Sequence, residues 1–468
     1  MKKIMTILFG VVMAGSIAGA AQAETGKQIY SAHCAACHGA SREGGMGPSL
    51  IDAKSMSGAG GKSRVVGIIR NGIPRSQMPA WGGRLSAADI GLVADYLFER
   101  PAPATGLKAV LKEPSERYPE LANFKLPKGF NIAVYSDAVP NARAIAISDS
   151  GIVFVSSRKV GKIYALVDSD KDHVIKKVVT VAEGLDSPIG LVMLNGSLFV
   201  SEMTRVIRFD DIEKSFDQSP GYKVVKDDFP KEKWHGEKII KVGPDGKLYV
   251  PIGADCNVCD REEDLHSKIY RMNPDGSEFE VFAKGVRNSV GFAWDPRTSE
   301  MWFTDNNRDE MGDNLPSCEL NHAPKAGMHF GFPYCHAGML PDPVFGKNRS
   351  CDEFTPPAAL LGPHTAPLGL NFYTGNMFPA QYRNNLFIAE HGSWNRENKI
   401  GYRVNLITIV NNKVASDTPF LDGFLKGEEV LGRPIDVAFM QDGSMLISDD
   451  HAGRIYRVTY SAPAARLK

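Results

Sequence analysis

Hydrophobic and polar positions alternate in short runs along most of the chain after residue 127. One pattern recurs there: an apolar strand, a turn that usually contains Asp-Gly or Asn-Gly, and a second strand rich in β-branched and aromatic residues. Each copy predicts an antiparallel hairpin, because such turns match the twist of paired strands. The six copies begin at Ala144, Gly190, Lys238, Gly291, Leu368 and Asp436.

Three copies are followed by a third strand of a common type, Gly-Lys-Ile-Tyr at 161–164, Ser-Lys-Ile-Tyr at 267–270 and Gly-Arg-Ile-Tyr at 453–456. Six units at this spacing are typical of a radial array whose sheets protect one another's edges. The pattern therefore predicts a mainly β fold, a six-bladed β-propeller over residues 127–468, with insertions after the fourth and fifth copies. A β-sandwich is the alternative, and the regular repeat disfavours it.

Before residue 127 the pattern changes to helical spacing. Helices are expected at 26–33 and 87–99, the second capped by Ser86 and with one apolar face. These elements predict a small all-α domain over residues 24–100. The apolar face consists of Ile90, Val93, Ala94 and Leu97.

Two further segments lie outside both predicted domains. Residues 1–23 combine Lys2 and Lys3, a short apolar run and a small-x-small site at 21–23, which together predict a cleaved signal peptide and not a membrane anchor. Export to the periplasm is expected, where cysteines can pair. Residues 101–126 are polar and contain prolines, and they predict a linker.

The α domain carries a CxxCH motif, Cys34, Cys37 and His38, which is typical of covalent c-type haem attachment. The two thiols would bind the haem vinyl groups and His38 the iron. A zinc or redox CxxC is the alternative, but the preceding helix, the export signal and Met78 favour haem. Met78 would be the sixth ligand, with Met46 as a rival, and a Met/His pair suits an electron acceptor. The segment resembles a small class I cytochrome c.

The charge balance and the remaining cysteines limit the possible partners and disulfides. The chain has 54 basic and 54 acidic side chains, so no nucleic-acid partner or polybasic membrane contact is expected, and no further run could span a bilayer. Cys256 and Cys259 are close enough in sequence for a local disulfide. Cys335 and Cys351 could close a loop with a second disulfide, which would leave Cys318 unpaired. Sequence alone leaves the pairing open.

Polar side chains gather where the hairpin strands begin and end. His235 precedes the third copy, and a histidine there could take the proton of an alcohol, although packing beside Trp234 is the simpler interpretation. Arg287 and Asn288 precede the fourth copy, where an arginine could stabilise a developing oxyanion or form a rim salt bridge. The turn at 305–309 suits calcium or a metal-free Asx turn. His364, the segment 390–396 and Arg433 are further candidates. Several such groups converging at one place indicate a functional site more strongly than any one of them does.

Six motifs in order carry a family resemblance across about residues 127–460. They are HGEKI…GPDGKLYVPIG, GVRNSVGFAWDP, TDNNRDEMGD, HTAPLGL, AEHGSWNR and GRPIDV. Together they resemble the pyrroloquinoline quinone (PQQ)-dependent soluble sugar dehydrogenases, in the sorbosone or aldose dehydrogenase branch. The resemblance implies a six-bladed propeller that binds PQQ over its channel, with calcium on the quinone and carboxylate oxygens of PQQ.

The resemblance also implies roles for single residues. His235 matches the catalytic base, Arg287 and Asn288 match contacts to the quinone, and Arg433 matches an arginine on a cofactor carboxylate. The carbonyl groups of Asn307 and Arg308 fall where calcium binds, and His364 falls at a cofactor contact. A cofactor lysine of the glucose enzymes has no clean match, and Arg396 or His391 could replace it.

The expected function is therefore a periplasmic quinohaemoprotein that oxidises a sugar or sugar aldehyde. Hydride would pass to PQQ, and electrons would pass to the haem and then to an external acceptor, such as a cytochrome, a copper protein or a quinone. A haem-bearing binding propeller without PQQ is the alternative from another class, and a calcium-dependent lactonase is a third.

Overall fold

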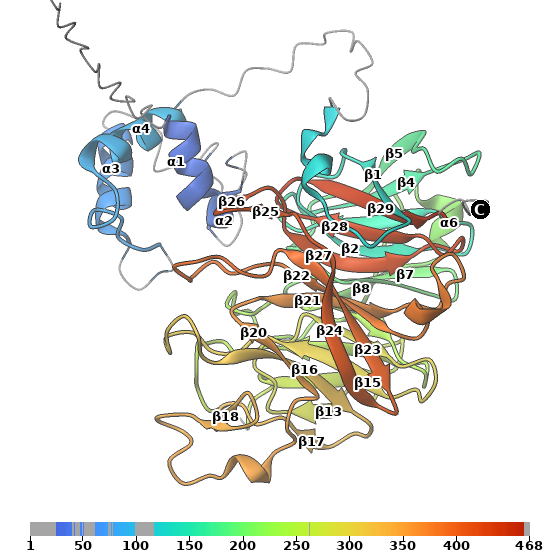
Figure 1. The fold of residues 1–468 in the computed structure, drawn as a ribbon. Helices are drawn as coiled ribbons and strands as arrows, with labels where there is room; N and C mark the ends of the chain where they lie inside the picture. The colour runs from blue at the N-terminus through green and yellow to red at the C-terminus, as the bar shows by residue number, and fades with distance from the viewer. Residues whose placement is uncertain are drawn as a thin grey trace, which may run out of the picture. The chain divides into compact units, whose positions relative to one another are not determined.

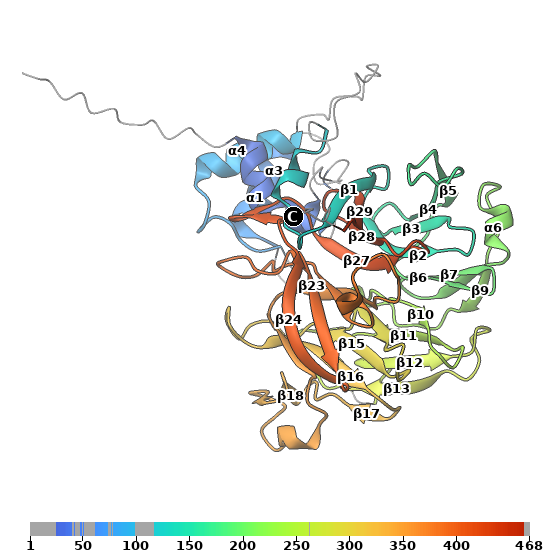
Figure 2. The same ribbon diagram turned by 45° about the vertical axis from the view of Figure 1, so that its right-hand side comes forward.

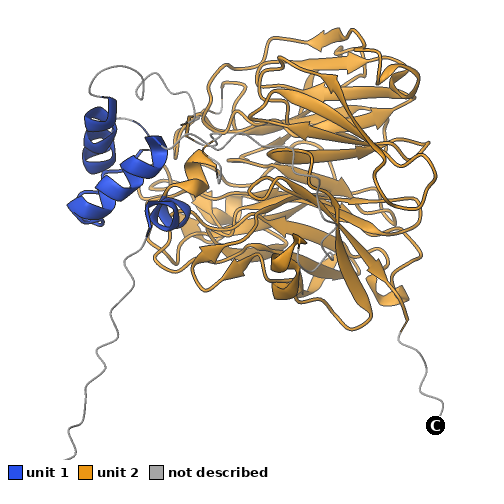
Figure 3. Ribbon diagram, turned by 90° about the horizontal axis from the view of Figure 1, so that it is seen from above, with its two compact units in different colours: residues 1–33, 52–101 blue, residues 34–51, 102–468 orange. Residues whose placement is uncertain are grey.

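The computed structural model describes residues 25–39, 42, 47, 48, 50, 61–73, 76, 78–98, 117–261 and 263–462. The chain forms two compact units, which Figure 3 colours separately. The first comprises residues 1–33 and 52–101, and the second comprises residues 34–51 and 102–468. The predicted signal peptide, Met46 and most of the predicted linker lie outside the described residues.

The first unit is helical. It contains α1 (Gly26–His33), α3 (Gly61–Asn71) and α4 (Ala87–Phe98), and Tyr30 of α1 packs on Tyr96 of α4 with ring centroids 5.3 Å apart. Ser86 caps α4: its Oγ accepts from the Asp89 N–H at 3.1 Å, and its own N–H donates to Asp89. The predicted apolar face of α4 is buried. Helix α3 was not predicted, because its small and charged residues blur the helical period.

The second unit contains six antiparallel sheets built around the six predicted hairpins. Three sheets come from the first half of the unit. They are β2–β5 (Ala142–Ile147, Val153–Ser157, Lys162–Val167, Lys177–Ala182), β6–β9 (Leu191–Leu194, Ser197–Ser201, Val206–Phe209, Lys223–Lys226) and β10–β13 (Lys241–Val242, Leu248–Ile252, Lys268–Met272, Glu280–Lys284).

The other three sheets come from the second half. They are β14–β15–β16–β20 (Gly291–Trp294, Met301–Asp305, Ser317–Ala323, Ala359–Pro363), β21–β24 (Pro367–Phe372, Leu386–Glu390, Arg403–Val410, Lys413–Leu421) and β27–β28–β29–β1 (Pro434–Phe439, Met445–Asp449, Arg454–Tyr460, Phe130–Ser136). Strand β1 therefore completes the last sheet from the start of the unit.

The first strands of the sheets lie innermost. β2 lies against β27 and β6, β6 against β10, and β21 against β14 and β27. Figures 1 and 2 show the sheets arranged radially around these inner strands. The fold is the predicted six-bladed β-propeller. Strand β6 meets β7 through Asn195 and Gly196, both with positive φ, as a two-residue hairpin turn requires.

The two predicted insertions are present. Between β16 and β20 the chain adds β17 (Met328–His329), which pairs in parallel with β13, the hairpin β18–β19 (Cys335–His336, Leu340–Pro341) and a short helix, η3 (Cys351–Glu353). Between β24 and β27 it adds the hairpin β25–β26 (Leu425–Lys426, Glu429–Val430). Shorter helices are α2 (Ala35–His38), η2 (Pro119–Asn123), α6 (Ile212–Ser215) and η4 (Ala380–Tyr382).

Both disulfides considered from the sequence are formed. Cys256 is bonded to Cys259 and Cys335 to Cys351, whereas Cys318 is free and buried. No helix in the described part of the chain is long and apolar enough to span a membrane.

Antiparallel pairing decides where polar side chains meet. The start of each first strand lies beside the end of its second strand, as Gly291 pairs with Thr304 in β14 and β15. Residues that precede first strands and residues that follow second strands therefore gather at one end of the propeller. We call this end the rim.

Candidate active site at the rim of the propeller

His235 lies on the rim, before β10, with a φ of +50°. Its Nδ1 is 2.7 Å from the Ala254 carbonyl oxygen, which can only accept, so Nδ1 carries the proton. Nε2 then holds the lone pair and accepts from the Trp234 indole N–H at 3.0 Å. Burial, followed by the charge of Arg287, keeps the pKa of His235 well below its usual value. The imidazole is therefore a neutral base at pH 7.

Arg287 and Asn288 precede β14, and the Asp305 carboxylate at the end of β15 accepts from both of their backbone N–H groups, at 2.8 and 2.6 Å. The buried Arg287 guanidinium donates to the carbonyl and side-chain oxygens of Asn257 at 2.8 and 3.0 Å. It also donates to the Asn306 carbonyl at 2.9 Å. Three of its five N–H groups are thus engaged, and the rest remain for Asp309 or a ligand.

Asp309 joins Arg287 to the next blade. Its carboxylate lies 3.6 Å from Arg287 Nη2 and 3.6 Å from His364 Nδ1, and it accepts from Asn395 Nδ2 at 2.6 Å. His364 Nε2 lies 3.0 Å from the Gly312 carbonyl, and the hydrogen bond to Asp309 raises the pKa of His364. Nε2 therefore donates, because a carbonyl oxygen can only accept. Arg396 lies nearby but donates to the carbonyl groups of Asp313 and Asn398.

The turn after β15 contains the two predicted calcium residues. Asn307 donates its side-chain N–H to the Ser317 carbonyl at 3.1 Å and to Glu319 at 2.9 Å, and Arg308 forms an ion pair with Asp342 at 2.5 Å. Within the described residues, no donor engages the carbonyl oxygens of Asn307 or Arg308. These two oxygens suit a hard cation.

Two buried carboxylates support this turn from below. Asp305 and Glu319 are paired directly across β15 and β16. Burial raises the pKa of Asp305 to about 7, and burial together with Asp305 raises the pKa of Glu319 to about 8. The pair therefore resists carrying two negative charges at neutral pH.

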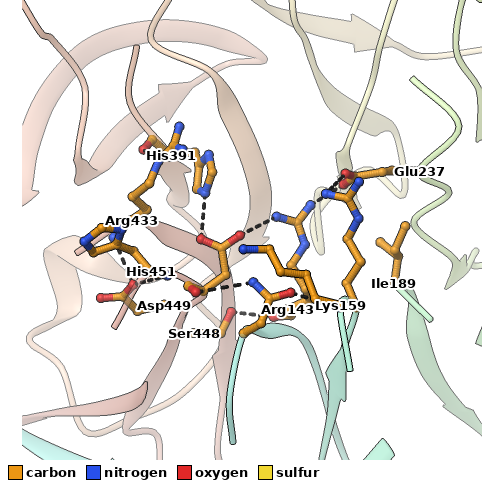
Figure 4. A network of polar contacts seen from close by, with 12 residues as sticks. Arg143, Lys159, Ile189, Glu237, His391, Arg433, Ser448, Asp449 and His451 are labelled. Atoms are coloured by element: carbon orange, nitrogen blue, oxygen red, sulfur yellow. Dashed lines mark hydrogen bonds and ion pairs between the residues drawn. The ribbon is translucent and has the colours of Figure 1, made fainter. Parts of the chain in front are cut away.

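Across the rim, a network of ion pairs surrounds Arg143 of β2 (Figure 4). Arg143 pairs with Glu237 and, at 3.0 Å, with Asp450, and Arg158 also pairs with Glu237. His391 Nε2 lies 2.9 Å from Asp450. Burial opposes ionisation of Asp450, but His391 and Arg143 outweigh it and hold the pKa of Asp450 well below its usual value.

Arg433, before β27, connects this network to the rest of the rim. Its guanidinium donates to the His391 and Gly392 carbonyl groups at 3.1 and 2.9 Å and lies over the Tyr402 ring. Burial and Arg433 lower the pKa of His391 to about 4, so this imidazole is neutral at pH 7. Because Asn395 contacts Asp309, the contacts run around the rim from His235 through Arg287 to Arg433.

The donor set of the rim fits PQQ, an anionic tricarboxylate. Among the described residues, three buried rim atoms have no hydrogen-bond partner: Arg143 Nε, Asn288 Oδ1 and Asn395 Oδ1. Buried polar atoms are normally paired, so these atoms indicate a ligand. Residues that would hold PQQ are Arg143, Arg287, Asn288, His364 and Arg433. Arg396 is the weakest of the predicted candidates, because carbonyl groups already engage it.

The CxxCH motif fits a covalent haem. Cys34 and Cys37 carry free thiols, and His38 Nδ1 lies 2.9 Å from the Pro48 carbonyl oxygen. This contact leaves His38 Nε2 for an iron ligand bond. Met78 belongs to the first compact unit, and its role as sixth ligand stays a prediction.

Sequence reasoning missed three parts of the site. Arg143 was overlooked although it is a charged residue among the apolar positions of an inner strand, which is itself a signal. Asn257 lies between two cysteines that drew attention only as a disulfide. Lys238 is fully buried, and its Nζ donates to the Met203 and Gly236 carbonyl groups at 2.7 and 2.8 Å; no pattern marked it.

Comparison with known proteins agrees with this architecture. Residues 124–461 match the TrAA12-like family, and residues 21–97 match the cbb3-type cytochrome c oxidase subunit III family. An uncharacterized protein of Borreliella burgdorferi is 34% identical over 363 residues, 72% of this chain and 91% of that protein. Cytochrome c6 of Picosynechococcus is 35% identical over 113 residues, 21% of this chain and 95% of that protein.

Solved structures share the propeller fold. The family AA12 enzyme of Trichoderma reesei superposes with a TM-score of 0.64 at 18% identity, over 72% of this chain and 98% of that chain. The PQQ domain of the pyranose dehydrogenase of Coprinopsis cinerea superposes with a TM-score of 0.60 at 18% identity, over 72% of this chain and 97% of that chain. The chain thus belongs to the TrAA12-like family and carries, before its propeller, a cytochrome c domain.

Proposed function

We propose that this protein is a quinohaemoprotein dehydrogenase that oxidises an aldose or a sugar aldehyde of the sorbosone type. PQQ would be its first electron acceptor, covalent haem c its second, and a cytochrome, copper protein or quinone the external one. The observation that carries the proposal is a neutral, half-buried histidine base beside a buried arginine on the rim of a TrAA12-like propeller. Export to the periplasm is part of the proposal, since thioether attachment and both disulfides suit that compartment.

His235 would remove the proton of the substrate hydroxyl at Nε2. Its Nδ1–H donates to Ala254, which fixes the ring and its tautomer. The substrate hydroxyl has to replace the Trp234 indole N–H, which now occupies the Nε2 lone pair. Arg287, with a guanidinium fixed by three oxygen acceptors, would place positive charge beside an acceptor oxygen.

Bound PQQ would supply a two-electron acceptor for hydride, and bound haem c a one-electron carrier. The carbonyl groups of Asn307 and Arg308 would hold calcium. Cys34, Cys37, His38 and Met78 would hold the haem. Because the haem domain is part of the same chain, it is present at a high effective concentration around the propeller.

The test is the visible spectrum of the purified, oxidised protein with PQQ and calcium, followed by a panel of aldoses and sugar aldehydes. Haem reduction that requires both PQQ and a sugar would support the proposal. The rate of haem reduction with each sugar would then rank the panel. Failure to bind PQQ, with no sugar-dependent reduction, would favour a binding propeller. Lactone hydrolysis with calcium alone would favour a lactonase.

A second experiment tests the electron path. Met78→Ala should keep dye-linked sugar oxidation and lose haem reduction, because the potential of a His-only haem falls. A normal low-spin spectrum in that variant would show that Met78 is not the ligand and would direct attention to Met46.

A further inference from the structure

We propose that the disulfide-closed loop at 254–259 is the device that positions both candidate catalytic groups, with Asn257 as the positioning residue. The inference rests on the proposed function for the roles of His235 and Arg287. It adds a role for the Cys256–Cys259 disulfide and for Asn257, neither of which touches the reacting atoms in this assignment.

Asn257 is the main anchor of the Arg287 guanidinium. Its backbone carbonyl accepts from Arg287 Nε at 2.8 Å, and its side-chain oxygen accepts from Nη2 at 3.0 Å. One residue therefore binds two nitrogens of one guanidinium. Such a two-point contact fixes the plane of the group as well as its place, which a single acceptor does not.

The same side chain fixes the ion-pair partner of Arg287. Asn257 Oδ1 also accepts from the Asp309 backbone N–H at 2.8 Å, and Asn257 Nδ2 donates to the Asp309 carbonyl at 3.2 Å. Asp309 in turn contacts Arg287 and His364. Asn257 thus sets the distance between an arginine and an aspartate on two neighbouring loops.

The start of the loop holds the base. The Ala254 carbonyl binds His235 Nδ1 at 2.7 Å, and the Ala254 N–H donates to the Arg287 carbonyl at 2.8 Å. Only two residues lie between Ala254, which binds His235, and Asn257, which binds the Arg287 guanidinium. A shift of this segment would therefore move the base and the arginine together.

The disulfide limits that shift. Cys256 and Cys259 flank Asn257 and Val258, and their bond closes a ring of four residues. Outside the ring, Asp255 receives two hydrogen bonds from Arg261, both at 2.9 Å. A segment without regular secondary structure is thus braced twice around Asn257. A cross-link over so few residues removes little chain entropy, so we assign its main effect to geometry and not to global stability.

The decisive variants change Asn257 and the two thiols separately. Asn257→Leu keeps the side-chain shape and removes four side-chain hydrogen bonds, those with Arg287, with the Asp309 N–H and carbonyl, and with Glu310. It should lower kcat about 10- to 100-fold with little change in KM, as loss of groups that orient a reacting residue commonly does. Asn257→Asp keeps the acceptor for Arg287 and should recover most of kcat. Cys256→Ser with Cys259→Ser should lower kcat about 10-fold.

The second disulfide provides the matched control. Cys335 and Cys351 are separated by 16 residues and lie in the insertion before β20. Cys335→Ser with Cys351→Ser should lower Tm more than Cys256→Ser with Cys259→Ser does, because the loop is longer. Its effect on kcat should be smaller than that of the Cys256, Cys259 double variant, since Asp342 of its loop binds Arg308 and not His235 or Arg287. The opposite ranking, in which the long-loop pair controls kcat, would overturn the proposal.

Amide hydrogen–deuterium exchange of the 285–289 segment in the PQQ-free protein gives a readout independent of turnover. Faster exchange in Asn257→Leu and in the Cys256, Cys259 double variant supports positioning. Unchanged exchange together with kcat within two-fold of the parent protein overturns it. If the parent protein shows no sugar-dependent haem reduction, the proposed function fails, and the exchange comparison alone then decides whether the loop positions Arg287.

Discussion

Two sides of the rim hold their charged groups in different ways. On the first side, which we call the carbonyl-held side, His235, Lys238 and Arg287 donate mainly to backbone carbonyl and amide oxygens. On the second, the ion-paired side, Arg143 lies among Glu237 and Asp450, and His391 binds Asp450. On the first side most contacts of these groups are to uncharged oxygens, whereas on the second side the charged groups form close ion pairs.

The pKa values follow this division. On the carbonyl-held side burial dominates: the pKa of His235 is far below normal and that of Lys238 falls to about 8. On the ion-paired side, charge partners overcome burial and keep Glu237 and Asp450 ionised. A base must be neutral and unpaired to act, whereas a group that holds a ligand needs a fixed charge. The two sides therefore suit chemistry and binding respectively.

The largest effect is expected from removing the base. His235→Ala should lower kcat about 10³-fold, within the range of general-base contributions, while PQQ affinity and the haem spectrum stay near those of the parent protein. Steady-state kinetics and fluorescence titration with PQQ measure these quantities. His173→Ala, in the loop after β4, is the control and should be neutral. Retention of a tenth or more of the parent activity would exclude His235 as the base.

The next largest effect is a loss of stability when an ion pair on the ion-paired side is broken. Arg143→Met leaves Glu237 and Asp450 each with one partner and should lower the free energy of unfolding by about 3 kcal/mol, as breaking buried pairs commonly does. Urea denaturation measures this. The control is Arg271→Met, which removes partly exposed ion pairs with Glu280 and Asp245 and should cost about 1 kcal/mol or less. Equal losses in both variants would contradict the division between the sides.

A smaller effect, on the pKa of His235, is expected from removing its hydrogen bond with Trp234. The Trp234 indole N–H donates to His235 Nε2 and so stabilises the neutral imidazole. Trp234→Phe removes that donor, and the pKa of His235 should rise by about one unit, the worth of one such hydrogen bond. The acidic limb of kcat/KM, which should lie below pH 6.5 in the parent protein, should move to higher pH. An unmoved limb would show that Trp234 does not control the base.

The smallest effect concerns the buried lysine. The pKa of Lys238 is about 8 in the folded protein, lowered by burial from 10.5. At a pH between these two values, Lys238 is mostly protonated in the unfolded chain and mostly neutral in the folded protein. Stability from this residue therefore rises with pH above 8. Between pH 8 and 9, the unfolding free energy of the parent protein should gain roughly 1 kcal/mol relative to Lys238→Met. Thermal melts at pH 7, 8 and 9 test this, and a constant gap would refute it.

Much of the fold was predictable because its signals are local. Each hairpin carries its own alternation and its own turn, as Asn195 and Gly196 illustrate, so six blades could be counted along the chain. The additions at β17 and β18 were not predictable in detail, because two-residue strands have no period. Strand β10 begins at Lys241 and not at Lys238, since the Ser201 side chain already binds the Lys238 carbonyl.

The site was predictable where a residue type itself signals chemistry. His235, Arg287 and Arg433 stand at corresponding blade ends, and the structure places them on one rim. The partners that fix these side chains could not be predicted, because a backbone carbonyl such as that of Ala254 has no signature in sequence. Asn257 acts through both its backbone and its side chain, which only the folded loop reveals.

The pairing of β1 with β29 has a consequence for the order of folding. Phe130 lies opposite Tyr460, so the last sheet needs strands from both ends of the propeller sequence. Five blades can fold from neighbouring residues, but the ring closes only when the final strand is present. We therefore expect closure to be a late and slow step, because contacts between distant residues form slowly. Until then the outer edge of β29, which pairs with β1 in the closed ring, stays open to pairing with another chain.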